Sequence, residues 1–322
     1  MRIVFMGTPD FAVGALEAII EAGHQVAAVV TQPDKPKGRG KEVQMTPVKA
    51  CALAHDIPVF QPVKVKEAEA VETLRGYQAD IFVVAAFGQI LSEEILNMPR
   101  YGCINIHASL LPKYRGAGPI QWAIINGEKV TGVTIMQMDK GLDTGDMLMK
   151  KEVEIGPDET GDSLHDKLAL AGAQLIVEAL PRIEQGILTP VKQNEEETCY
   201  ARMLHKSMGK IDWQQSAVKL DCLIRGLISW PGAYTSCHGK MLKIWEETVA
   251  REEELQDGSC KEILPGKAQP GTVIGVGKEA FYVQTGDGIL KLLTVQPEGK
   301  KRMAVKDFML GYPVKAGEML GE

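Results

Sequence analysis

The sequence predicts an α/β protein, with a mostly parallel sheet covered by helices on both faces and a smaller antiparallel β domain after it. Two observations support this organisation. In the first half, short apolar runs alternate with segments of helical spacing. In the second half, apolar runs of strand length follow one another, and a glycine-rich turn separates the last two.

The alternation of strands and helices begins at the N-terminus. Strands are expected at residues 3–6, 26–31, 58–60, 81–86, 103–106 and 133–138. Helices are expected at residues 11–22, 48–54 and 160–183. Thr8 and Thr46, each followed by proline, are suitable N-caps for the first two helices, because a threonine hydroxyl can accept a free backbone N–H. The third helix has one apolar face, formed by Leu164, Leu168, Ala171, Leu175, Ala179 and Leu180.

The composition changes near Leu188, which suggests a domain boundary. Residues 1–188 are expected to form the first domain, residues 189–206 a polar linker without periodicity, and residues 207–322 a C-terminal domain. In this last part a helix is expected at residues 218–228. Strands are expected at residues 241–245, 272–276, 281–285 and 289–295. Gly286-Asp287-Gly288 is typical of a hairpin turn, so a small antiparallel barrel is expected.

Charge and cysteine content exclude several classes of protein. The chain of 322 residues has a net charge of −6, which argues against a general nucleic-acid coat but allows a local basic site. Residues 201–322 carry 17 cations and 15 anions, whereas the first 200 residues carry 19 and 27. Six scattered cysteines without a CxxC pair suggest a reducing compartment. The apolar run at the N-terminus is too short for a signal peptide, so a cytoplasmic protein is expected. The chain is also expected to be a monomer.

Asn105 and His107 form a candidate site for acyl transfer. On a strand they would face the same side, about 6.6 Å apart at ~3.3 Å per residue. Asn can donate hydrogen bonds to a developing oxyanion, and His can carry a proton. Asp143, in the polar cluster at residues 139–146, is expected in a loop at the carboxyl edge of the sheet. The alternatives are a structural histidine and ordinary turn aspartates.

Two rival chemistries find less support in the same stretch. Cys103 and His107 would lie about 13 Å apart along a strand, at ~3.3 Å per residue, which is too far for one metal ion. Ser109 lacks the G-x-S-x-G context of a nucleophile elbow. A dinucleotide-binding oxidoreductase is disfavoured because the glycine pattern after the first strand, Gly7-Thr8-Pro9, is not G-x-G-x-x-G.

A longer string brings these residues together. Residues 109–120 read SLLPKYRGAGPI, with Asn105-x-His107 before them and Gly141-Leu142-Asp143-Thr144-Gly145 after them. This pattern resembles the signature of the folate-dependent formyltransferases. The resemblance implies a Rossmann-like, doubly wound, mostly parallel sheet followed by a small OB-like β-barrel domain. It also implies transfer of a formyl group from 10-formyltetrahydrofolate to a primary amine, without a metal.

The resemblance implies roles for individual residues. Asn105, His107 and Asp143 would be catalytic, with the identity of the general base left open between His107 and Asp143. The folate would be bound by residues on three loops: Phe87, Gly88, Ile90, Leu91, Ser109, Leu110, Leu111, Pro112, Met138 and Asp139. From the residues alone, packing in the core explains Phe87, Ile90 and Leu91 equally well.

Two features favour an acceptor carried by tRNA. Residues 32–41 set four cations among prolines and glycines, a segment suited to a phosphate backbone or simply to solvent. The C-terminal half resembles the tRNA-binding domain of family members that act on aminoacylated tRNA. The resemblance implies methionyl-initiator tRNA as acceptor, bound through Lys35, Lys37, Arg39, Lys41, Arg202 and Lys206. Met203 stands where a lysine is expected. The alternative acceptor is an amino sugar nucleotide.

Overall fold

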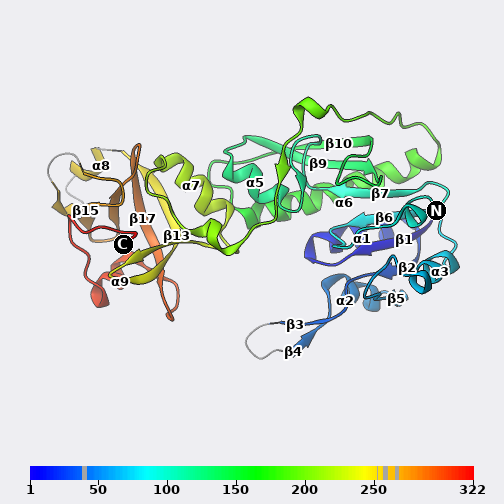
Figure 1. Ribbon diagram of the computed structural model, residues 1–322, viewed down its shortest axis with the longest axis horizontal. Helices are drawn as coiled ribbons and strands as arrows, with labels where there is room; N and C mark the ends of the chain where they lie inside the picture. Colours follow the sequence, from blue (N-terminus) through cyan, green and yellow to red (C-terminus); the bar gives the residue numbers. More distant parts are fainter. Residues whose placement is uncertain (38–41, 252, 257–259, 265–267) are drawn as a thin grey trace. The chain divides into compact units, whose positions relative to one another are not determined.

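The computed structural model of the chain describes residues 1–37, 42–251, 253–256, 260–264 and 268–322 (Figure 1). It divides into two compact units. Unit 1 comprises residues 1–119, 130–155 and 163–202, and unit 2 comprises residues 120–129, 156–162 and 203–322. Within the described residues, no helix has the length and apolar character needed to span a membrane.

The core of unit 1 is a seven-stranded sheet with the order β10-β9-β7-β6-β1-β2-β5. Its strands are β1 (Arg2–Gly7), β2 (Gln25–Val30), β5 (Val59–Phe60), β6 (Ile81–Ala85), β7 (Cys103–His107), β9 (Val130–Gln137) and β10 (Met147–Glu154). The five strands from β7 to β5 are parallel, whereas β9 and β10 are antiparallel to their neighbours. The predicted mostly parallel sheet is therefore confirmed.

Helices cover this sheet on both faces. They are α1 (Val13–Glu21), α2 (Pro47–Ala54), α3 (Ala68–Gly76), α4 (Glu93–Leu96) and α6 (Gly161–Glu184). On one face α6 approaches β7 closely, since a side chain at Gly172 would meet Ile106 at 2.9 Å. On the other face, α3 and α4 share an apolar cluster with alternate residues of β1 and β6, including Val4 and Val84. The six apolar residues predicted to line one face of α6 are all buried.

One of the two predicted helix caps is wrong. Thr46 caps α2, because its side-chain oxygen accepts the N–H of Lys49 at 3.2 Å. Thr8 does not cap its helix: its hydroxyl donates to the carbonyl oxygen of Phe87 at 2.9 Å, and a 3-10 turn, η1 (Asp10–Ala12), precedes α1. A tertiary contact thus replaces the local one that the sequence predicted.

Two small sheets complete unit 1. The basic segment forms a hairpin, in which β3 (Lys35–Lys37) pairs with β4 (Glu42–Gln44). The other sheet pairs β8 (Arg115–Gly116) with β11 (Tyr200–Ala201). The latter fixes part of the segment 191–201, which also contains the 3-10 turn η2 (Glu195–Glu197), against unit 1. Residues predicted from their composition to be a linker therefore make specific contacts.

Unit 2 is built on an antiparallel sheet with the order β12-β13-β17-β16-β15-β14, and β18 pairs with β17. These strands are β12 (Ala233–Cys237), β13 (Lys240–Ala250), β14 (Cys260–Ile263), β15 (Val273–Gly277), β16 (Phe281–Gln284), β17 (Ile289–Pro297) and β18 (Met303–Ala304). Its helices are α5 (Pro119–Ile125), η3 (Lys206–Gly209), α7 (Ala217–Gly226), α8 (Glu253–Gln256) and α9 (Val305–Gly311). The predicted small antiparallel domain and the hairpin between β16 and β17 are confirmed.

Glu247 on β13 is a buried acid inside unit 2. Its side chain lies near the ion pair between Arg225 and Asp221 of α7, in which the nitrogen and oxygen are 2.7 Å apart. Its Oε2 atom has no hydrogen-bond partner within the described residues. Burial, and secondarily the charge of Asp221, raise the pKa of Glu247 to about 8 from 4.5. The carboxyl group is therefore largely protonated at neutral pH.

The raised pKa of Glu247 predicts a pH-dependent stability. The pKa of Glu247 is higher in the folded protein than in the unfolded chain. The contribution of Glu247 to the free energy of unfolding is therefore complete below pH 4.5 and is lost as the pH rises to about 8. Glu247→Gln should remove this dependence. The free energy of unfolding of the variant minus that of the native chain should rise by up to about 1.4 kcal/mol per pH unit between pH 4.5 and about 8. Urea unfolding at several pH values measures the difference, and a difference independent of pH would contradict the prediction.

Candidate active site

Asn105 lies in the middle of β7, between two other strands. Its register partners are Val84 on β6 and Met136 on β9. Because side chains alternate along a strand, Asn105 and His107 face the same side of the sheet. The residue is half-buried, and its carboxamide makes no hydrogen bond to any residue that the structure describes. Its two amide N–H groups are thus available to an oxygen atom of a ligand.

His107 is the last residue of β7 and is only 5% exposed. Its Nε2 atom lies 3.0 Å from the carbonyl oxygen of Tyr114. A carbonyl oxygen can only accept, so Nε2 must carry a hydrogen and donate it. In the neutral ring, Nδ1 is then the nitrogen that can take up a proton.

Asp143 faces this second nitrogen. Its Oδ2 atom is 3.8 Å from Nδ1 of His107, a separation suited to an ion pair with the protonated ring but too long for a direct hydrogen bond. The same oxygen accepts the backbone N–H of Gly116 at 2.9 Å. Asp143 has a φ of 54°, in the left-handed region that aspartate tolerates better than most residues. The carboxylate is therefore held in one place by its surroundings.

The loop that carries Asp143 leaves the sheet at the edge opposite to the predicted one. β9 runs antiparallel to β7, with Gln137 opposite Ile104, so the following residues begin beside the amino end of β7. There the N–H of Met138 donates to the carbonyl oxygen of Cys103 at 2.8 Å. The prediction placed this loop at the carboxyl edge, which holds for Asp143, beside the last residue of β7, but not for the start of the loop. The contact with His107 shows that the loop turns back over the sheet.

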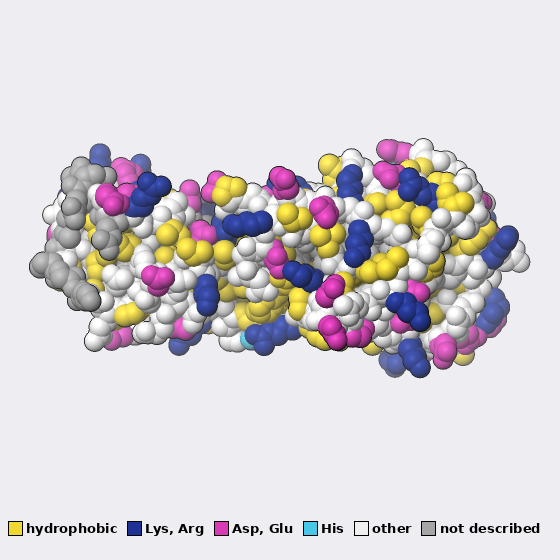
Figure 2. Space-filling view, turned by 90° about the horizontal axis from the view of Figure 1, so that it is seen from above, with side chains coloured by type: hydrophobic (Ala, Val, Ile, Leu, Met, Phe, Trp, Pro, Cys, Tyr) yellow, Lys and Arg dark blue, Asp and Glu magenta, His cyan; other side chains and the backbone are white. Residues whose placement is uncertain are grey.

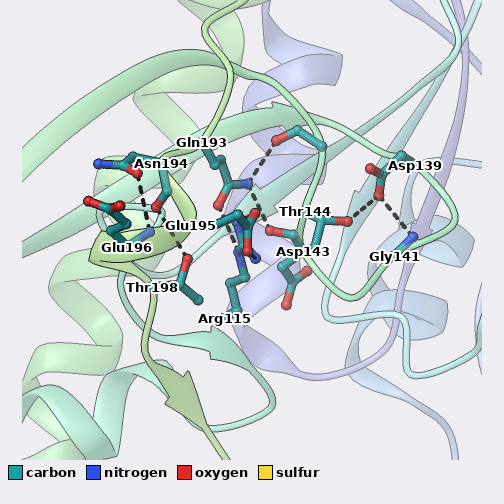
Figure 3. Close-up of polar contacts among 11 residues, drawn as sticks. Arg115, Asp139, Gly141, Asp143, Thr144, Gln193, Asn194, Glu195, Glu196 and Thr198 are labelled. Atoms are coloured by element: carbon teal, nitrogen blue, oxygen red, sulfur yellow. Dashed lines mark hydrogen bonds and ion pairs between the residues drawn. The ribbon is translucent and has the colours of Figure 1, made fainter.

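Arg115, Gln193 and Glu195 form a network around this loop that the sequence did not reveal (Figure 3). Arg115 is fully buried, and its guanidinium donates to both carboxylate oxygens of Glu195, at 3.0 and 2.8 Å. These bonds lower the pKa of Glu195. Nε of Arg115 donates to Oε1 of Gln193 at 2.9 Å. Arg115 lies in the string that carries the resemblance, but Gln193 and Glu195 lie in the polar segment after residue 188 and gave no chemical signal.

Asp139, proposed above as a folate ligand, also shapes the loop. Its Oδ1 atom accepts the backbone N–H of Gly141 at 2.9 Å and the hydroxyl of Thr144 at 2.7 Å (Figure 3). Asp139 is exposed, so its other oxygen can still meet a ligand. The residue therefore has an evident local role as a turn aspartate.

The remaining residues proposed for folate binding differ widely in exposure. Phe87, Leu91 and Met138 belong to one apolar cluster on the Asn105 side of the sheet. Leu111 packs with Met136 in a second apolar cluster. Leu110 and Pro112 are the neighbours of Leu111 in the sequence. Ser109 is buried, and its hydroxyl donates to the carbonyl oxygen of Lys113 at 2.7 Å. Gly88 has a φ of +80°, and Ile90 is 85% exposed. An apolar ligand could cover Ile90.

The residues proposed to bind tRNA are only partly described. Lys35 is exposed on β3, and the backbone of Lys37 ends that strand, whereas Arg39 and Lys41 lie outside the described residues. Asp34 fixes the base of the hairpin, because its carboxylate accepts from Nζ of Lys49 at 2.5 Å and from Gln61 at 2.7 Å. These two bonds lower the pKa of Asp34. Arg202 and Lys206 are both exposed.

One group of potential metal ligands occurs among the described residues. Ligand atoms of Glu17, Cys51 and His55 lie within 4.8 Å of one another. Glu17 lies on α1 and Cys51 on α2, and His55 follows α2 directly. None of these residues belongs to the network around Asp143.

Comparisons with known proteins identify the family of the chain. The family model described as formyl transferase matches residues 1–180, and the one described as formyl transferase, C-terminal domain, matches residues 203–313. A methionyl-tRNA formyltransferase of Agathobacter rectalis is 57% identical over 317 residues, which cover 98% of each chain.

Two solved structures have a similar fold. The N-formyltransferase from Helicobacter canadensis, in complex with folinic acid and dTDP-3-aminofucose, has a TM-score of 0.63 at 20% identity and covers 92% of this chain and 99% of its own. HypX from Aquifex aeolicus, in complex with tetrahydrofolic acid, has a TM-score of 0.62 at 18% identity, covering 98% of this chain and 48% of its own. The extent of the family matches and the identity to the Agathobacter relative are decisive: the chain belongs to the formyl transferase family.

Proposed function

We propose that the chain transfers the formyl group of 10-formyltetrahydrofolate to the free amino group of methionyl-initiator tRNA, giving N-formylmethionyl-tRNA for translation initiation in the cytoplasm. The observation that carries the reaction is the placement of the free Asn105 amide, His107 and Asp143 on one side of the sheet. The acceptor is supported by the 57% identity to a relative named for methionyl-tRNA.

The residues around Asn105 fit a formyl donor of this kind. Apolar side chains from the loops after β6 and β9 lie on the Asn105 side of the sheet, and a flat aromatic ring system such as a pterin prefers such surroundings. Ile90, at 85% exposed, would lose contact with water on binding. We assign folate contacts to these loops and to residues 109–112.

The reaction forms a C–N bond between the formyl carbon and the amine and breaks the C–N bond between the formyl carbon and the folate. The amine nitrogen attacks the formyl carbon, the carbonyl oxygen gains negative charge, and the carbon–nitrogen bond to the folate then breaks. Asn105 would donate to the charged oxygen, because its amide hydrogens have no protein acceptor within the described residues. An α-amino group titrates near 8, so a useful fraction is already neutral at physiological pH.

The proton released by the amine would pass to Nδ1 of His107. That atom is the ring nitrogen able to accept it, since Nε2 donates to the carbonyl oxygen of Tyr114. The nearby carboxylate of Asp143 would stabilise the resulting imidazolium. His107 would then give this proton to the folate nitrogen as the carbon–nitrogen bond breaks, so that tetrahydrofolate leaves with an N–H group. In this assignment His107 is the base and then the acid, and Asp143 orients the ring and balances its charge.

The hairpin of β3 and β4 would contact the tRNA backbone. On the face shown in Figure 2, Lys and Arg side chains are interspersed with Asp and Glu, so that face has no single extended basic field. A local grip by Lys35, Lys37, Arg39 and Lys41 suits the chain's net charge of −6 better than general attraction to the whole protein. Arg202 and Lys206, both exposed, would add contacts near the end of the RNA.

The reaction is tested directly with purified components. We expect the protein and 10-formyltetrahydrofolate to block the amine of charged initiator tRNA, seen as altered mobility on an acidic gel. Uncharged initiator tRNA serves as the matched control and should remain unmodified. Formylation of a dTDP-amino sugar in place of the charged tRNA would contradict the proposed acceptor, and inactivity toward both would contradict the reaction.

A second prediction concerns the tRNA contact. Arg39→Ala should raise the KM for tRNA and reduce the slope of log KM against log salt by about 1, as expected for one lost phosphate contact. Its kcat at saturating tRNA should stay unchanged. Lys66→Ala, which removes an exposed cation outside the loops assigned to folate, is the comparison variant. A salt slope equal to that of the native chain would show that Arg39 lies in a solvated loop.

A further inference from the structure

Asp143 occupies an uncommon backbone conformation in a loop whose own hydrogen bonds, from Asp139 to Gly141 and Thr144, do not involve Asp143. Its φ of 54° is uncommon for a residue other than glycine, and such conformations persist where the surroundings determine them. Its side chain accepts one hydrogen bond, from the N–H of Gly116 at 2.9 Å. This bond holds the carboxylate but does not involve the main chain of Asp143.

Gln193 contacts the main chain of this loop. Its Nε2 atom donates to the carbonyl oxygen of Asp143 and to that of Gly145, both at 2.8 Å (Figure 3). An amide nitrogen has two hydrogens, and both are used here on two carbonyls that flank the turn. The loop is thereby held at two points, one on each side of Thr144.

The orientation of the Gln193 amide is itself determined. Its Oε1 atom accepts from Nε of Arg115 at 2.9 Å. Because a guanidinium can only donate, this bond identifies the oxygen and places the NH2 group toward the Asp143 loop. Arg115 is 0% exposed and is locked by two further bonds to Glu195.

The same dipeptide, Arg115-Gly116, therefore reaches Asp143 by two routes. The N–H of Gly116 binds the carboxylate directly, and the side chain of Arg115 orients the glutamine that binds the main chain. The dipeptide is itself paired with Tyr200 and Ala201. A side chain at Gly116 would come within 2.8 Å of the carbonyl oxygen of Ala201, so the pairing tolerates no Cβ.

We propose that Gln193 is a positioning residue for formyl transfer, which holds Asp143 at His107 through the two main-chain carbonyls. The proposal rests on the function proposed above and extends it to a residue from the polar segment between the two matched family regions. Gln193 is not the sole anchor of that segment. Val191 and Met147 exchange two backbone hydrogen bonds, both at 2.9 Å, and β11 pairs with β8.

Loss of the glutamine donors should therefore affect the rate more than the fold. A displacement of about 1 Å in a catalytic group can cost about 100-fold in rate. We expect Gln193→Ala to lower kcat about 10- to 100-fold, with the KM values for 10-formyltetrahydrofolate and tRNA unchanged within about twofold. Gln193→Glu, which keeps the acceptor for Arg115 but loses both donors, should give a similar loss without opening a cavity.

The matched control is the neighbouring Lys192→Ala. Its side chain is exposed and makes no hydrogen bond or ion pair to any residue that the structure describes. We expect native kcat, KM and thermal unfolding temperature for this variant.

An Asp143→Ala background separates positioning from general structural damage. If Gln193 acts through Asp143, adding Gln193→Ala to Asp143→Ala should lower kcat less than about twofold further. A full additional loss in that background would overturn the proposal, as would native kcat in both single variants. An inactive native chain would instead contradict the proposed function, so the two failures are distinguishable.

Discussion

A charged guanidinium that lies wholly inside unit 1 is the constraint on which the rest of the site depends. A buried cation has to be paired and hydrogen-bonded, and Arg115 meets this need with Glu195 and Gln193. Because both partners come from the segment 191–201, that segment must lie against the sheet. Gln193 of this segment in turn binds the carbonyl oxygens of Asp143 and Gly145, so the segment fixes the Asp143 loop. The position of Asp143 at His107 therefore depends on the pairing of the Arg115 guanidinium.

The sequence was sufficient to predict the parts of the site that depend on local periodicity. The alternation around Asn105 and His107 requires a strand, and a strand puts both side chains on one face. The same reasoning predicted α6 and its apolar face, and the cap of α2 by Thr46. In each case the signal and the structure it predicts lie within a few residues of one another, so no knowledge of the tertiary fold was needed.

Features that depend on distant partners could not be predicted in this way. An apolar strand at residues 130–137 has the same pattern whether it runs parallel or antiparallel, so the sequence did not show that the Asp143 loop begins at the amino end of β7 and turns back toward His107. Thr8 binds Phe87 instead of its helix. The composition of residues 189–206 indicated a linker, because the polar side chains that bind Arg115 are the same types that line solvated segments.

The coupling of His107 to Asp143 is the central claim, and a double-mutant cycle on the single-turnover rate of formyl transfer tests it most directly. We expect His107→Ala to lower the rate at least about 100-fold, as loss of a proton acceptor does. Adding Asp143→Ala should then change the rate by less than about threefold, because the carboxylate acts through the imidazole. Losses that multiply would contradict the claim and would give Asp143 a separate role in the transfer.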